Sequence, residues 1–354
     1  DGHGRAADPL AAAVIRQDIL EGRFKRFNEA SGAWDGYPYG LYYLYGGYFN
    51  RYLQERFGME RYARLWKHIG DGAPNELVQP YLFMRGHFYK TYGIELEDAW
   101  AEFGEAMAIR SPVVMAAERL RPLSRLSALA VHGSTAYFYD AAKGELRALE
   151  LESGAERRLF RAAYGIGRVD PSPDGERLLV SGVEVVAGGF SRYALWEYEL
   201  RSGRLSKLPY AGLRDAAYAP DGSIVAVKAD GYETALVQAR GGAVASILGG
   251  SRNLSYASPR FDAGGQTLYA LAKLDGAVSV VRLPWGSDEG RADPTRAELL
   301  VLPEGLGALR YLGPGRDGLL MAWNDDELYR LVELGADTIR YQTVSISGDR
   351  KSVV

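Results

Sequence analysis

Few side chains in this chain could act as metal ligands or nucleophiles. Its histidines are His3, His68, His87 and His132, and no two of them are four residues apart. The sequence therefore has no His-Glu-x-x-His helix, in which two imidazoles one turn apart hold zinc and the glutamate activates water. It also has no cysteine and no Gly-x-Ser-x-Gly stretch. These absences exclude thiolate metal sites and cysteine nucleophiles in this chain, and they argue against a serine peptidase with a nucleophile elbow.

Tyrosine is unusually common among the side chains that could bind or act on a ligand. The chain has 24 tyrosines, and many of them lie between residues 37 and 62. Two interpretations of the cluster at 37–48 stay open. Its phenols could form a wall that binds a peptide or a carbohydrate, or they could pack half-buried between helices, because a tyrosine ring suits both surroundings.

The composition is that of an ordinary soluble globular protein, with 47% hydrophobic and 25% charged residues. The net charge of -3 leaves no basic footprint, so we expect no nucleic-acid partner. No apolar run approaches the roughly 18 residues that a membrane span needs. The chain begins at Asp1 without a basic and then apolar leader, so we expect this start to be a processed or cut end.

Apolar residues recur at helical spacing in the first part of the chain. The pattern predicts helices at 45–57, 62–69 and 96–107, the first two ending at Gly58 and Gly70, and a further helix over 9–21. We therefore assign residues 1–110 to a small helical domain and 111–121 to a linker.

From residue 122 to 354 the apolar period becomes two, and turn sequences recur about every 45 residues. Ser172-Pro173-Asp174-Gly175 and Ala219-Pro220-Asp221-Gly222 each precede a β-rich run, and weaker copies end at Gly265 and Gly318. Asp-Gly supplies the positive φ angles of a tight hairpin. Four short strands per unit predict a β-propeller, because so small a sheet must stack on its neighbours; the alternative is an antiparallel sandwich.

These turns resemble those of TolB-like and WD-repeat-like β-propellers. The fold class expected is therefore mainly β with an α-helical N-terminal part: a propeller of about six blades plus a small helical domain. Units beginning near 126, 166, 212, 255 and 308 make five, and 345–354 resembles the start of a sixth, so we expect the chain to stop inside or just before its last blade.

The helical part resembles the C-terminal half of gluzincin (peptidase MA-like, aminopeptidase-like) zinc metallopeptidases, over about residues 5–105. Tyr43-Leu44-Tyr45-Gly46 matches their Tyr-x-x-Gly helix start, and Trp100-Ala101-Glu102-Phe103 matches their final helix. The resemblance implies that Tyr43 donates a hydrogen bond to an oxyanion, a role that suits a neutral phenol. It also implies zinc ligands upstream of Asp1. The alternative is that Tyr43 is one more packed aromatic residue.

Two functions follow as expectations. The first is a fragment of a zinc metallopeptidase-like protein, inactive by itself, whose propeller binds or gates a peptide or protein partner. The second is a non-catalytic, extracytoplasmic propeller that serves as a binding scaffold. In both cases this chain holds no cofactor and no metal, zinc belongs at most to the parent protein, and the resemblance implies a periplasmic or other extracytoplasmic bacterial location. Whether the parent is an enzyme, and its oligomeric state, stay open.

Overall fold

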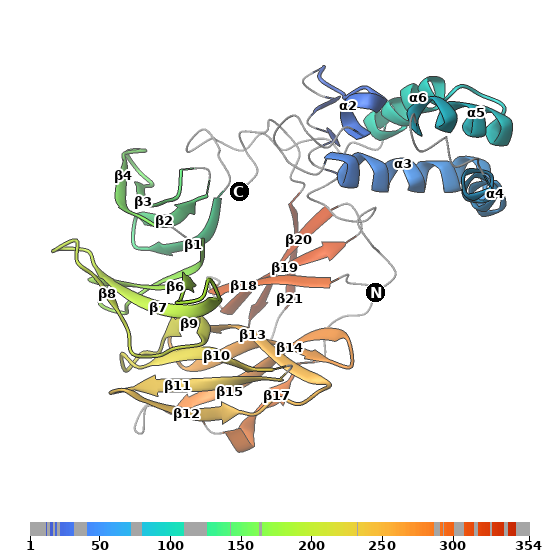
Figure 1. The fold of residues 1–354 in the computed structure, drawn as a ribbon. Coiled ribbons are helices and arrows are strands. Elements are labelled where there is room, and N and C mark those ends of the chain that lie inside the picture. The colour runs from blue at the N-terminus through green and yellow to red at the C-terminus, as the bar shows by residue number, and fades with distance from the viewer. Residues whose placement is uncertain are drawn as a thin grey trace. The chain divides into compact units, whose positions relative to one another are not determined.

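The computed structural model describes residues 12, 15–16, 18–19, 22–31, 41–71, 80–109, 126–141, 143–162, 165–231, 233–286, 291–292, 294–300, 308–314, 318–325, 328–335 and 339–344. The chain divides into two compact units, one holding the helices and the other holding most of the strand residues (Figure 1). The linker predicted at 111–121 lies outside the described residues, as does most of the helix predicted over 9–21.

Five helices are described in the helical unit: α2 (Phe27–Ser31), α3 (Leu41–Phe57), α4 (Met59–Gly70), α5 (Pro80–Tyr92) and α6 (Leu96–Ile109). The helices predicted at 45–57, 62–69 and 96–107 are therefore confirmed. Gly58, with φ of 85°, separates α3 from α4, and its N–H donates to the carbonyl of Gln54 at 3.0 Å. The positive φ explains why a glycine ends α3.

Aromatic side chains form the core of the helical unit. Tyr45, Tyr48, Phe88 and Phe103 are at most 2% exposed. The buried polar atoms of such residues need partners, and the indole N–H of Trp100 donates to the carbonyl of Lys25 at 2.7 Å. Among the described tyrosines of the cluster at 37–48, Tyr45 and Tyr48 thus pack in the core, whereas Tyr42 and Tyr43 are exposed.

The strands of the second unit form successive small antiparallel sheets, which we call blades 1 to 5 in chain order (Figure 1). Blade 1 contains β1 (Leu126–His132), β2 (Thr135–Asp140), β3 (Glu145–Glu150) and β4 (Glu156–Arg161). Blade 2 contains β5 (Ile166–Pro171), β6 (Arg177–Val185), β7 (Ser191–Glu199) and β8 (Leu205–Lys207). Blade 3 contains β9 (Leu213–Tyr218), β10 (Ile224–Asp230), β11 (Glu233–Arg240) and β12 (Ala243–Leu248).

Blade 4 departs from the four-strand pattern by one strand. It contains β13 (Leu254–Phe261), β14 (Thr267–Leu274) and β15 (Ala277–Gly286), with the two-residue strands β16 (Arg291–Ala292) and β17 (Glu298–Leu299) both paired to β15. Blade 5 contains β18 (Ala308–Pro314), β19 (Gly318–Asp325), β20 (Leu328–Gly335) and β21 (Ile339–Val344). Each first strand contacts the first strand of the next blade, as in a β-propeller.

The expectation of about six blades is corrected to five blades among the described residues. The described residues form four four-stranded sheets and one five-stranded sheet. The segment expected to begin a sixth blade, 345–354, lies outside the described residues. Counting turn sequences cannot tell a further blade from a turn-like tail, because a turn is a local feature and a blade needs its partner strands.

The blades stack through both of their faces. In β10, Val225 and Val227 belong to a core shared with blade 4, while Ile224 and Ala226 belong to a core shared with blade 2. Successive side chains of a strand point to opposite faces, so a strand buried on both sides carries apolar residues in sequence. This explains the continuous apolar run that follows the turn at Gly222.

The first strands of blades 1, 3 and 4 contain bulges whose residues have positive φ. Ala128, Asp215 and Ser258 have φ values of 55°, 52° and 50°, beside shifts in strand register. A bulge frees backbone groups that the neighbouring strand no longer pairs. In blade 3 the N–H of Ala216 donates to Oγ of Ser181 in blade 2 at 3.0 Å, which ties the two blades together.

No helix in the described part of the chain is long and apolar enough to cross a membrane.

Candidate functional site

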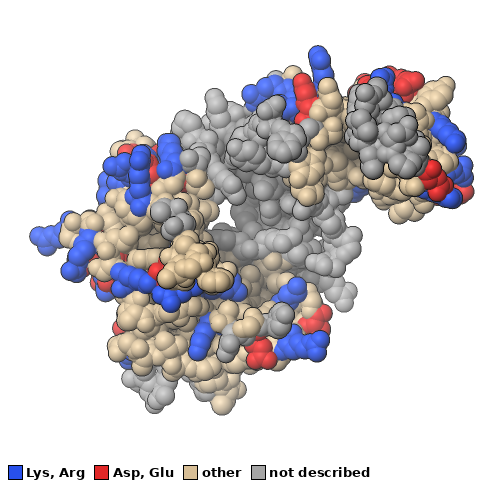
Figure 2. Space-filling model, in the orientation of Figure 1, with Lys and Arg blue, Asp and Glu red and all other residues tan. Residues whose placement is uncertain are grey.

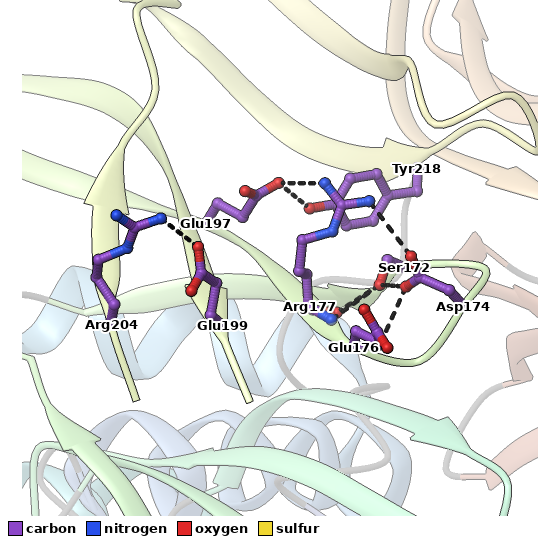
Figure 3. Close-up of polar contacts among 8 residues, drawn as sticks. All are labelled: Ser172, Asp174, Glu176, Arg177, Glu197, Glu199, Arg204 and Tyr218. Atoms are coloured by element: carbon purple, nitrogen blue, oxygen red, sulfur yellow. Dashed lines mark hydrogen bonds and ion pairs between the residues drawn. The ribbon is translucent and has the colours of Figure 1, made fainter. Parts of the chain in front are cut away.

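The densest polar network drawn in Figure 3 begins at the turn between β5 and β6. The hydroxyl of Ser172 donates to Oδ1 of Asp174 and accepts the N–H of Arg177 at 2.9 Å, and Oδ1 of Asp174 also accepts the N–H of Glu176 at 3.0 Å. The hydrogen bond from Ser172, followed by that from the Glu176 N–H, lowers the pKa of Asp174. Gly175 has φ of 72°. The Ser-Pro-Asp-Gly sequence thus closes a turn with its own side chains.

Arg177 extends this network to blade 3. Its guanidinium lies 3.2 Å from Oε2 of Glu197, 3.5 Å from Asp174 and 5.7 Å from the ring centre of Tyr218. The Tyr218 hydroxyl donates to the same Glu197 oxygen at 2.7 Å (Figure 3). Burial, and then the hydrogen bond to Glu197, raise the pKa of Tyr218, so the phenol stays protonated.

A second contact joins the same two blades. Oδ2 of Asp170 accepts the N–H of Tyr218 at 2.8 Å, while Oδ1 lies 3.3 Å from the guanidinium of Arg168. Desolvation raises the pKa of Asp170, and Arg168 opposes that shift. Arg168 is only 5% exposed. A buried ion pair of this kind holds a specific geometry, because removing one partner leaves the other charge in an apolar setting.

These groups hold structure together rather than presenting reactive atoms. Ser172, Asp174, Glu197 and Tyr218 each use their polar atoms on a neighbouring residue of the chain. A nucleophile or general base must instead reach a substrate atom. We therefore interpret the network as a clamp between blades 2 and 3.

A feature of a different kind extends from blade 2. The paired ends of β6 and β7 form a hairpin, residues 183–193, which we call the β6–β7 arm. Val183 lies opposite Tyr193 and Val185 lies opposite Ser191. Val185 and Tyr193 are 41% and 43% exposed, and Phe190 at the turn is 74% exposed. One side of the arm is therefore an exposed apolar surface.

The other side of the arm is charged. Glu184 lies opposite Arg192, and its two carboxylate oxygens lie 2.5 Å from Arg192 and 2.5 Å from Lys207. Hydrogen bonds from Lys207 and then Arg192 lower the pKa of Glu184. Basic side chains are conspicuous over blades 1 and 2 (Figure 2). The arm thus has one charged and one apolar side, like a surface that meets a partner.

The turn of the arm holds Phe190 in place. The N–H of Val186 donates to the carbonyl of Phe190 at 2.9 Å, and Gly188 and Gly189 have φ of 87° and 80°. A Cβ on Gly188 would lie 3.3 Å from the Phe190 ring. The positive φ favours glycine at both positions, and at Gly188 an added side chain would also crowd the Phe190 ring.

The sequence did not single out this aromatic residue. The stretch 182–190 is recognisable as a long insertion, and the alternation of Val183 and Val185 before two glycines and Phe190 was the available signal. That signal does not distinguish a buried strand from an exposed one.

Tyr43, the predicted catalytic residue, lies in the first turn of α3. Its side chain is 49% exposed, and its ring centre lies 4.1 Å from that of Tyr42. Among the described residues no three His, Asp or Glu side chains are grouped so as to hold a metal ion, so the described part of the chain does not fit a zinc site. His68 contacts the hydroxyl of Thr91 at 2.9 Å, and His3 lies outside the described residues. The role of Tyr43 stays a prediction.

The chain was compared with protein families and with known proteins. No family model matches the chain. An uncharacterised protein of Treponema pallidum (strain Nichols) is 29% identical over 240 residues, which are 66% of this chain and 22% of that protein. The chain thus spans about a fifth of the length of that relative.

The solved structures that are similar to the chain include two TolB-type proteins. TolB of Acinetobacter baumannii is 15% identical, with 64% of this chain and 56% of that chain covered and a TM-score of 0.49. A TolB candidate of Agrobacterium tumefaciens is 13% identical, with 62% and 80% covered and a TM-score of 0.49. The assignment of a β-propeller here rests on the pairing and stacking of the blades themselves.

Proposed function

We propose that the propeller unit binds a protein or peptide partner through the apolar side of the β6–β7 arm. The observation that carries the proposal is Phe190, which is 74% exposed at the end of a hairpin whose turn is closed by a hydrogen bond from the Val186 N–H to the Phe190 carbonyl. Exposed aromatic residues held in one geometry are frequent anchors of protein interfaces, because they bury a large area at little cost in conformational entropy.

The size of the effect follows from the exposed area of Phe190. A phenylalanine that buries about 150 Å² of apolar surface gains roughly 3 to 4 kcal/mol at ~25 cal/mol per Å². Part of this gain offsets the ordering of the partner, so we expect Phe190→Ala to weaken binding by about 2 kcal/mol, or roughly thirtyfold in Kd.

The experiment first selects peptides that bind the chain and then tests whether their binding depends on the Phe190 side chain. A phage library of random peptides about 12 residues long is selected against the full chain, and the selected peptides are titrated by calorimetry into the wild type and Phe190→Ala. The matched control is Val244→Ala, since Val244 is a 42% exposed apolar residue on β12 in another blade. We expect only the Phe190 variant to bind more weakly. Peptides that bind all three proteins equally would refute the assignment to the arm.

A second candidate function is a zinc metallopeptidase-like parent protein in an extracytoplasmic bacterial location, and the observation that favours it is the exposed side chain of Tyr43. We propose that Tyr43 would then donate a hydrogen bond to an oxyanion, as the gluzincin resemblance implies, with the metal ligands contributed from outside this chain. Tyr43→Phe is made in the full-length protein and compared with Tyr42→Phe, its exposed neighbour. A large loss of peptide turnover is expected for Tyr43→Phe only, and equal turnover in both variants would remove the role.

A further inference from the structure

The helical unit contains a cavity of about 170 Å³ among α2, α3, α4, α5 and α6. Its walls include the buried side chains of Phe49, Leu53 and Phe88, and the exposed residues Tyr42 and Trp66 also line it. Tyr42 and Trp66 are 38% and 49% exposed, so part of the cavity lining faces solvent. The lining thus combines buried core residues with solvent-exposed ones.

The lining among the described residues carries no charged side chain. Of the polar side chains in this lining, Ser31 and Asn50 bond to the backbone: Nδ2 of Asn50 donates to the carbonyl of Gly46 at 2.8 Å, and Oγ of Ser31 donates to that of Asn28 at 3.4 Å. An ionised ligand would lose its hydration in such a place without gaining a counter-charge. The cavity thus suits a neutral, apolar group.

Aromatic rings dominate the shape of the wall. Phe49 and Trp100 meet edge to face with ring centres 4.8 Å apart, and Phe27 meets Trp100 in the same way at 5.2 Å. Aromatic rings prefer such edge-to-face neighbours, so a bound aromatic group finds favourable contacts with rings that are already packed edge to face.

No structural constraint on α3 requires a glycine at position 46, beside the cavity. It lies inside α3, its φ is not positive, and an added Cβ would meet no atom within 4 Å. Glycine inside a helix is unfavourable relative to alanine. Neither the backbone conformation nor close packing requires glycine at this position. The lack of a side chain at Gly46 leaves that part of the cavity unfilled.

From these observations we propose that the helical unit has a binding site for one neutral aromatic group of about the size of benzene, supplied by a small molecule or by a phenylalanine side chain of a peptide. An engineered apolar cavity of about 150 Å³ stays dry and binds benzene, so the volume here is sufficient. The site is independent of the β6–β7 arm, and the two proposals can fail separately.

The methionines provide a direct measurement. The chain has five methionines, of which Met84 lines the cavity, Met107 lies in the core of the same unit and Met59 is 62% exposed on α4. The full chain is labelled with ¹³C at the methionine methyl groups, and toluene and indole are titrated into it. The Met84 signal, assigned with Met84→Leu, is expected to shift and saturate, since a bound ring produces a ring-current shift. The Met59 signal is expected to stay in place.

Two glycine variants complete the test. Gly46→Leu should fill the cavity and weaken toluene binding at least tenfold. Gly86→Leu, at a helical glycine that also has open space around it but does not line the cavity, should leave binding unchanged. An unshifted Met107 signal in each variant shows that the core is intact. If Met84 does not respond to either probe, or responds equally in Gly46→Leu, the proposal is wrong.

A capped tripeptide, acetyl-Ala-Phe-Ala-amide, distinguishes the two sources of the aromatic group. A Met84 shift with the tripeptide as well as with toluene assigns the site to a peptide side chain. A shift with toluene alone assigns it to a small molecule.

Discussion

Two tyrosines of the helical unit, the buried Tyr92 and the partly buried Tyr52, should respond in opposite ways to the loss of their hydroxyls. Tyr92 is 5% exposed, and its hydroxyl is buried without a hydrogen-bond partner among the described residues. A buried polar group that lacks a partner costs roughly 1 to 3 kcal/mol. We therefore expect Tyr92→Phe to raise the free energy of unfolding of the helical unit by about 1 kcal/mol at pH 7.

Tyr52 is the matched control. Its hydroxyl donates to Oε2 of Glu102 at 2.8 Å, and Arg56 lies 2.8 Å from the same carboxylate. Because the carboxylate keeps Arg56 and is partly exposed, Tyr52→Phe should lower the free energy of unfolding by only about 1 kcal/mol.

The pH dependence of the Tyr92 variant is a second test. Burial raises the pKa of Tyr92 from its ordinary value of 10.0 to about 12. Between these values the unfolded chain loses the Tyr92 proton and the folded chain keeps it, so the wild type loses stability as the pH rises from 10 to 12. A shift of two units corresponds to at most about 2.7 kcal/mol. Tyr92→Phe should lack this part of the loss, because the other tyrosines are common to both proteins.

Urea unfolding followed by circular dichroism at the helix signal, at pH 7 and at pH 11.5, measures both effects. The reasoning is refuted if Tyr92→Phe is destabilised by 1 kcal/mol or more at pH 7, roughly the value of a hydrogen bond. It is also refuted if the loss of stability at high pH is as large in the variant as in the wild type.

Two further predictions concern the propeller unit. Gly250→Ala should lower the free energy of unfolding of this unit by roughly 3 kcal/mol or more, because an added Cβ would overlap the backbone oxygen of Thr234. Gly249→Ala, where an added Cβ has open space, should change it by less than about 1 kcal/mol. Equal urea midpoints for the two variants would contradict this prediction. Ser181→Ala should lower the free energy of unfolding by about 1 to 3 kcal/mol, since it leaves the buried N–H of Ala216 without its acceptor. Amide hydrogen exchange at Ala216 should become faster, and unchanged exchange would contradict the proposed link between blades 2 and 3.

The helices that the sequence predicts are those with one apolar stripe, and two of them end at a glycine, Gly58 and Gly70. The pattern missed α5, which begins at Pro80 and carries the run from Tyr81 to Met84 before Phe88. A proline in the first turn was an available signal for its start. An apolar run of four residues does not repeat at helical spacing, so periodicity alone could not identify this helix.

Local chemistry explains why the sequence by itself determined the hairpins of the propeller. Gly133, Gly175, Gly222 and Gly265 all have positive φ in turns between the first two strands of their blades. A positive φ and a self-bonded Asp-Gly turn depend on residues a few positions apart, and the alternation of apolar residues follows from the pleat of a strand.

Only the tertiary structure decided which of these residues meet and which stay exposed. Tyr218 donates to Glu197, 21 residues earlier, because two blades stack there. Phe190 is exposed although the apolar alternation before it does not distinguish a buried strand from an exposed one, and Gly46 borders a cavity although its neighbours pack in the core. Such features depend on how distant elements fill space around a side chain, which residue type and spacing along the chain do not specify.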